Sequence, residues 1–135
     1  MMTGSNPLGH RRIAKADSAA IAEAVERLLV GDVVAIPTET VYGLAADASN
    51  AEAVAQIYRT KGRPDFNPLI VHVPDHAAAE RLAQFDDRAS MLAFRFWPGP
   101  LTLVLPLQPD APVAKAVTAG LPTIALRCPA HPVMQ

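Results

Sequence analysis

The sequence is poor in the residues that several common functional classes require. Its 135 residues include one cysteine, Cys128, which excludes an intramolecular disulfide and fits a reducing compartment. Aromatic residues make up 5% of the chain, too few and too scattered for a base-stacking platform. No apolar run approaches the length of a membrane span, and the N-terminus lacks the apolar segment of a signal peptide. We therefore expect a cytoplasmic protein with no membrane association.

The chain also lacks an excess of either charge. Twelve basic and thirteen acidic residues give a net charge of −1, so any site for an anion must be local. No cysteine or second histidine stands at ligand spacing from His72, so the sequence predicts no metal site. It also contains no Ser-His-Asp order, no phosphate loop and no dinucleotide-binding glycine pattern.

Half of the residues are apolar, which is enough to bury the core of one domain. We predict this domain over residues 13–135, after a disordered tail over residues 1–12. Capping residues and apolar periodicity predict four helices, which begin at Asp17 or Ser18, at a capping box over residues 49–52, at Asp75, and at Asp86 or Asp87. The first helix is expected to end at Gly31, and the other three near Arg59, Phe85 and Trp97.

Short apolar runs predict strands between these helices, over residues 33–36, 69–73, 101–105 and 123–127. Eight prolines between Pro98 and Pro132 predict extended strands and turns there, because the interior of a helix does not tolerate that density. The alternation of helices and strands favours one α/β domain with a mixed, twisted sheet and flanking helices.

The most informative segment is residues 61–73, a loop that runs into an apolar strand. Pro64 and Pro68 stiffen this loop, and the residue before each proline is pushed towards an extended conformation. Lys61 and Arg63 are thereby held in one geometry, which suits a polyphosphate or a carboxylate. The alternative interpretation is a solvated basic turn.

Two other places offer polar groups beside apolar strands. Residues 37–44 carry hydroxyls and a carboxylate after a strand, where α/β folds place ligands, although threonines in a turn also satisfy local backbone groups. His72 alternates with Val71 and Val73, so it faces away from both, either as a ligand contact or as a core or edge histidine with a satisfied hydrogen bond. Arg127 ends the last strand and can reach a ligand carboxylate from the same sheet edge as His72.

Four segments occur in the order that is seen in the Sua5/YciO/YrdC family: residues 37–44, 61–73, 97–102 and 122–127. The chain resembles this family over nearly all of residues 13–135, and residues 61–69 resemble its threonylcarbamoyl-AMP synthase branch. The resemblance implies a YrdC-like twisted open sheet with a large positive cavity.

The resemblance also implies an activity, that of a nucleotidyltransferase. Such an enzyme converts L-threonine, bicarbonate and ATP, carried as Mg-ATP, to threonylcarbamoyl-AMP and pyrophosphate. The product is passed to the tRNA threonylcarbamoyl transferase complex, which modifies adenosine 37 of tRNA. A direct contact with RNA is a further expectation.

The resemblance assigns two ligands to two sets of residues. The residues that resemble threonine contacts are Thr40, His72 and Arg127. The residues that resemble ATP contacts are Arg63, Asn67 and Thr123. Lys61 and Arg63 match the first half of the family's Lys-x-Arg…Ser-x-Asn signature and are the expected catalytic residues.

The second half of that signature is absent from the sequence. Pro132 looks like the first residue of a helix that has no room to form, so the C-terminal end is expected to be truncated and the chain alone a poor enzyme. Two alternatives remain. One is a carbamoyl-adenylating domain of the hydrogenase-maturation type, against which the single cysteine speaks. The other is a module for double-stranded or other RNA, against which the net charge of −1 speaks.

Overall fold

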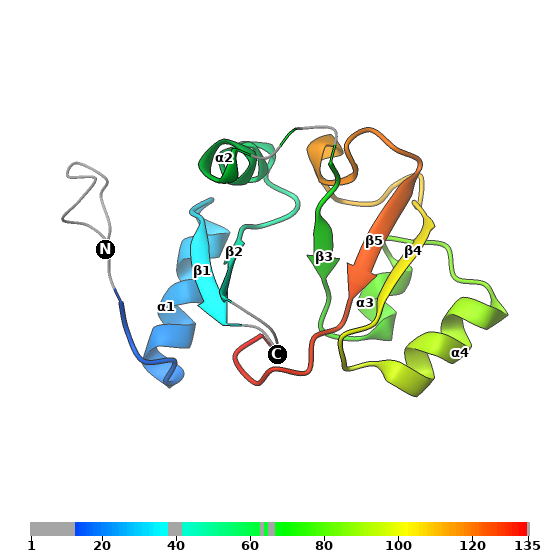
Figure 1. The fold of residues 1–135 in the computed structure, drawn as a ribbon, viewed down its shortest axis with the longest axis horizontal. Helices are drawn as coiled ribbons and strands as arrows, with labels where there is room; N and C mark the ends of the chain where they lie inside the picture. The colour runs from blue at the N-terminus through cyan, green and yellow to red at the C-terminus, as the bar shows by residue number, and fades with distance from the viewer. Residues whose placement is uncertain (1–12, 38–41, 63, 65–66, 135) are drawn as a thin grey trace.

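The computed structural model describes residues 13–37, 42–62, 64 and 67–134, and its elements alternate between helix and strand (Figure 1). The first half contains α1 (Ser18–Leu29), β1 (Val34–Pro37), β2 (Tyr42–Ala45) and α2 (Ala51–Lys61). The second half contains β3 (Ile70–His72), α3 (His76–Glu80), α4 (Asp87–Phe96), β4 (Thr102–Pro106), the 3-10 helix η1 (Lys115–Thr118) and β5 (Thr123–Arg127). The α/β class is confirmed. None of the helices in the described residues combines the length and the apolar composition that a membrane span requires.

The strands form two separate sheets. β1 and β2 pair antiparallel, with Val34 opposite Ala45. The other sheet has the order β3-β5-β4, in which β5 is parallel to β3 and antiparallel to β4. Figure 1 shows β5 in the middle of this sheet, with α2 and η1 near the end where β3 and β5 begin. The predicted mixed sheet is therefore present in β3, β5 and β4, but the first predicted strand lies outside it, in the separate β1-β2 sheet.

The predicted aspartate caps are confirmed. The carboxylates of Asp17, Asp75 and Asp86 accept hydrogen bonds from the backbone N–H three residues further on, at 2.9, 2.8 and 2.7 Å. The predicted capping box at Ser49 is wrong in one respect, because Asn50 caps α2 while the Ser49 hydroxyl donates to Asp47 at 2.6 Å. These caps fix where the helices begin.

The structure differs from the sequence pattern in three places. The helix expected to reach Phe85 ends at Glu80, because the backbone N–H of Gln84 donates to the carbonyl of Pro106 beyond the end of α3. No strand was predicted over Tyr42–Ala45, which pairs with β1. The proline-rich half also contains η1, a helix of 4 residues, short enough to fit between prolines.

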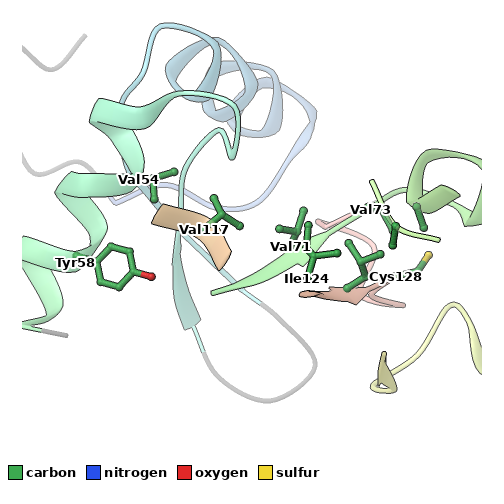
Figure 2. Close-up of a cluster of buried hydrophobic side chains, with 10 residues drawn as sticks. Val54, Tyr58, Val71, Val73, Val117, Ile124 and Cys128 are labelled. Atoms are coloured by element: carbon green, nitrogen blue, oxygen red, sulfur yellow. The ribbon is translucent and has the colours of Figure 1, made fainter. Parts of the chain in front are cut away.

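One face of the three-stranded sheet is covered by the core (Figure 2). Successive residues of a strand point to opposite faces. Val71, Leu103 and Leu126, which are paired across the three strands, lie on the covered face. The core is completed by Ile124 of β5 and by residues of α2, α3, η1 and the segments that follow β3, α3 and β5: Val54, Tyr58, Val73, Ala79, Ala83, Val117 and Cys128. The predicted burial of Cys128 is confirmed.

The opposite face of this sheet is largely uncovered, and we call it the open face. It consists of Ile70 and His72 of β3, Thr123, Ala125 and Arg127 of β5, and Thr102, Val104 and Pro106 of β4. Val104 is 65% exposed and Ile70 is 45% exposed, which shows how little covers this side of the strands. The open face is therefore available to a ligand.

Tyr58→Phe should destabilise the fold. The Tyr58 side chain is buried, and its hydroxyl lies 2.8 Å from the carbonyl oxygens of both Asn67 and Ala116. Loss of the hydroxyl removes a part-buried hydrogen bond that ties α2 to these two segments and should cost about 0.5–1.5 kcal/mol of unfolding free energy. The denaturation midpoint measures this. Tyr42→Phe, at a position 76% exposed, is the control and should change stability by less than about 0.5 kcal/mol. Equal effects of the two substitutions would show that the hydroxyl of Tyr58 is not an anchor.

Candidate functional site

A row of three polar side chains crosses the open face at one end of the sheet. The strand register places His72 opposite Arg127, and Arg127 opposite Thr102. Neighbouring strands lie about 4.8 Å apart, so the row spans roughly 10 Å. The predicted proximity of His72 and Arg127 at one sheet edge is thereby confirmed as strand pairing.

The side chain of Arg127 is held within this row. Its Nε–H donates to Oγ1 of Thr102 at 3.0 Å, and the pair is half-buried. Among the described residues, Thr102 is the side chain to which the guanidinium of Arg127 donates a hydrogen bond. The two terminal nitrogens, with four N–H donors, are the part of the group suited to a carboxylate.

A second polar position lies at the other end of β5. Thr123 shares the open face with Arg127 and lies four residues earlier, which is about 13 Å along a strand. Ala125 lies between them, with Ile70 and Val104 on the neighbouring strands at the same level. Asn67 lies just before β3, which is parallel to β5, so Asn67 and Thr123 lie at the same end of the sheet.

Lys61 is placed by the end of α2. It is the last residue of this helix and is exposed, and Gly62 ends the helix in the left-handed conformation with φ of 61°. The Gly62 N–H donates to the carbonyl of Arg59 at 3.3 Å. Since the hydroxyl of Tyr58 lies against the carbonyl of Asn67, one turn of α2 positions both ends of the loop between Lys61 and β3.

An open cavity of about 1490 Å³ lies between the two sheets and brings together residues from both halves of the chain. Lys61 and His72 line it, together with Pro37 and Tyr42, whereas Arg127, Thr123 and Asn67 do not. Its described charged lining consists of Lys15, Glu23, Arg27, Asp32, Asp47 and Lys61, three groups of each sign. A positive character of the cavity stays a prediction.

Two predicted site residues, Thr40 and Arg63, lie outside the described residues. The structure brings His72 and Arg127 together and places Thr123 on the same face, while Lys61 and Asn67 lie at the two ends of one loop. Sequence reasoning assigned no role to Thr102, because cross-strand partners depend on register. Among the described residues, no group of three or more His, Cys, Asp or Glu side chains could hold a metal ion.

Comparison with known proteins identifies the same family along most of the chain. A family model named Sua5_yciO_yrdC, with the description "Telomere recombination", matches residues 26–135. A threonylcarbamoyl-AMP synthase of Bacillus subtilis is 54% identical over 114 residues, which cover 84% of this chain and 33% of the relative. The chain thus spans about a third of the length of this curated relative.

Solved structures agree with this match. A structure of Pyrococcus abyssi Sua5 complexed with L-threonine is 46% identical, with a TM-score of 0.83 over 92% of this chain and 35% of that protein. A structure of full-length HypF is 24% identical, with a TM-score of 0.74 over 84% of this chain and 17% of that protein, a likeness that shows the fold alone.

Gly62→Ala should destabilise the end of α2 that positions Lys61. A left-handed conformation costs a residue with a side chain about 1–2 kcal/mol, although an added Cβ would meet no atom within 4 Å. Thermal unfolding measures the loss. Gly43→Ala is the matched control, because a Cβ there also meets no atom within 4 Å and the backbone is not left-handed. If both substitutions shift the melting temperature equally, the conformation at Gly62 is not the cause.

Proposed function

Because the chain belongs to the Sua5/YciO/YrdC family, we propose that it forms the substrate-binding part of a threonylcarbamoyl-AMP synthase. The observation that carries this proposal is the placement of Arg127 and Thr123 on the same open face of β5. That face offers a carboxylate-binding group at one end and a hydroxyl at the other, with the small Ala125 between them. An extended ligand with an amino acid at one end and a nucleotide at the other fits this arrangement.

In this proposal the amino-acid end of the ligand lies over the row that contains Arg127. The terminal nitrogens of Arg127 hold the carboxylate of L-threonine in a bidentate contact. His72, on the neighbouring strand, and Thr40 recognise the amine or the hydroxyl of the substrate. Both roles position the substrate, and neither requires a nucleophilic side chain.

The nucleotide end lies towards the loop between α2 and β3. Bicarbonate and the threonine amine give a carbamate and water, and a carbamate oxygen attacks the α-phosphate of ATP as pyrophosphate leaves. Negative charge grows on the phosphates during this step, and Lys61 and Arg63 stabilise it. Asn67 and Thr123 hold the nucleotide. Magnesium enters as part of the substrate Mg-ATP.

The remaining expectations form part of the same proposal. Residues 13–135 act as one YrdC-like domain, and the chain works in the cytoplasm as a nucleotidyltransferase. Its product passes to the tRNA threonylcarbamoyl transferase complex for modification of adenosine 37, with a direct RNA contact as a further property. These statements rest on the names of the relatives together with the open-face geometry.

The assay that tests the proposal is pyrophosphate release from ATP with and without threonine and bicarbonate. We expect pyrophosphate release to require both threonine and bicarbonate. A chimera in which this segment replaces the matching 114 residues of the Bacillus subtilis relative should release pyrophosphate with the same dependence on both substrates. Pyrophosphate release from ATP that requires carbamoyl phosphate, and neither threonine nor bicarbonate, would instead identify the hydrogenase-maturation reaction. Steeply salt-dependent RNA binding without threonine-dependent release, in the chain and in the chimera, would identify an RNA-binding module.

Lys61→Ala and Arg63→Ala should each reduce threonine-dependent pyrophosphate release. Loss of one charge-assisted contact to a phosphate costs about 1.5–3 kcal/mol, which corresponds to roughly a ten- to hundredfold lower rate. Lys115→Ala removes another exposed lysine and should leave the rate unchanged. Circular dichroism should show that all three variants remain folded. Undiminished release by the double variant at Lys61 and Arg63 would refute their catalytic assignment.

Arg127→Ala should weaken threonine binding more than ATP binding, because its proposed partner is the carboxylate of the amino acid. We expect a loss of roughly tenfold or more in threonine affinity, measured by calorimetric titration of each ligand. Arg88→Ala, at an exposed position of α4, is the control for loss of an arginine and should change neither affinity. Equal losses for both ligands at Arg127, or no loss, would make its role structural.

A further inference from the structure

We propose that Thr102 is a positioning residue that sets the direction from which Arg127 receives the carboxylate of L-threonine. This inference rests on the proposed function, because it concerns the orientation of a group that the function assigns to threonine. It adds to that function a residue from β4, the one strand of the sheet that otherwise supplies no contact to either ligand.

The position of Thr102 is fixed by the backbone. β4 pairs with β5 over five residues, and Thr102 is the residue opposite Arg127 at the end of this ladder. Both side chains therefore project from the open face at the same level. The hydroxyl of Thr102 can reach Nε of Arg127 without any displacement of either strand, as the 3.0 Å distance shows.

The hydrogen bond to Nε leaves Arg127 one edge of its guanidinium for a bidentate contact with a carboxylate. A guanidinium can present two donor edges to a carboxylate: the two terminal nitrogens, or Nε with one terminal nitrogen. Thr102 accepts from the Nε–H and so occupies the second edge. Arg127 then presents its terminal edge, and the bound carboxylate must lie beyond the tip of the side chain.

The chemistry of threonine suits this role. Its β-branched side chain has few χ1 rotamers in a strand, so the acceptor oxygen stays in place. Oγ1 accepts from Arg127 through a lone pair, and its own proton remains available to a group on the open face. A serine could make the same bond with more rotational freedom, whereas a valine of the same shape could not make it at all.

The test compares three substitutions on β4 in the chain. Thr102→Val keeps the branched shape and should weaken threonine binding by roughly tenfold, with ATP binding unchanged. Thr102→Ser keeps the hydroxyl and should restore most of the affinity. Val104→Thr changes the neighbouring exposed position on the same face and is the matched control, which should bind threonine as the unsubstituted chain does.

A positioning residue must act through the group that it positions. Thr102→Val should therefore have no further effect on threonine affinity when Arg127 is already replaced by alanine. An undiminished loss in that background would show that Thr102 acts independently of Arg127 and would overturn the inference. A loss of ATP affinity equal to that of threonine in Thr102→Val would overturn it as well, since the effect would then be structural.

A measurement without ligand separates this inference from the proposed function. NMR of the ¹⁵N-labelled chain measures how fast the Nε–H proton of Arg127 exchanges with water. This exchange should be slow in the unsubstituted chain and in Thr102→Ser, and faster in Thr102→Val. Equal exchange in all three would refute the positioning bond whatever the protein binds. If Thr102→Val speeds up the exchange but neither the chain nor the chimera binds threonine, the hydrogen bond is confirmed and the proposed function is refuted.

Discussion

The arrangement of the site depends on the backbone pairing of β5 with a strand on each side. β5 is the only strand of its sheet with two neighbours, one parallel and one antiparallel. This pairing buries Ile124 and Leu126 on one face and fixes Thr123, Ala125 and Arg127 on the other. Because the side-chain period of a strand is two residues, a slip of one position would exchange the core with the site. The burial of the core face therefore also specifies the open face.

Local signals in the sequence predicted much of the fold. Aspartate caps at Asp17, Asp75 and Asp86 act within three residues, so no knowledge of distant contacts is needed to recognise them. The strand over residues 123–127 was predicted with its observed bounds, because an apolar run between a proline and a buried cysteine has few alternatives. The end of the helix after Asp75 depends on a contact far away in the sequence, the hydrogen bond from Gln84 to Pro106. The strand β2 is short and carries no alternating apolar pattern, so its pairing with β1 was not predicted.

The same distinction applies to the site. Arg127 and His72 stand out in the sequence as polar residues in or beside apolar strands, and their motifs are recognisable as such. Thr102 ends one of the four family segments, residues 97–102, but that segment assigns it no role, and its role follows only from its position opposite Arg127. Register between strands is set by the burial of a whole face, so a single sequence does not reveal such a partner.

The site is assembled from segments that are far apart in the chain. Thr102 and Arg127 are separated by 25 positions, and the buried hydroxyl of Tyr58 reaches a carbonyl 58 positions away. Contacts of this separation are slow to form, because the entropy of closing the intervening loops must be overcome first. The row across β3, β5 and β4 can therefore exist only after the central strand has found both neighbours. In the proposed function, ligand binding at this row therefore requires a completely folded sheet, and a nascent chain that has been synthesised only as far as β4 cannot yet bind.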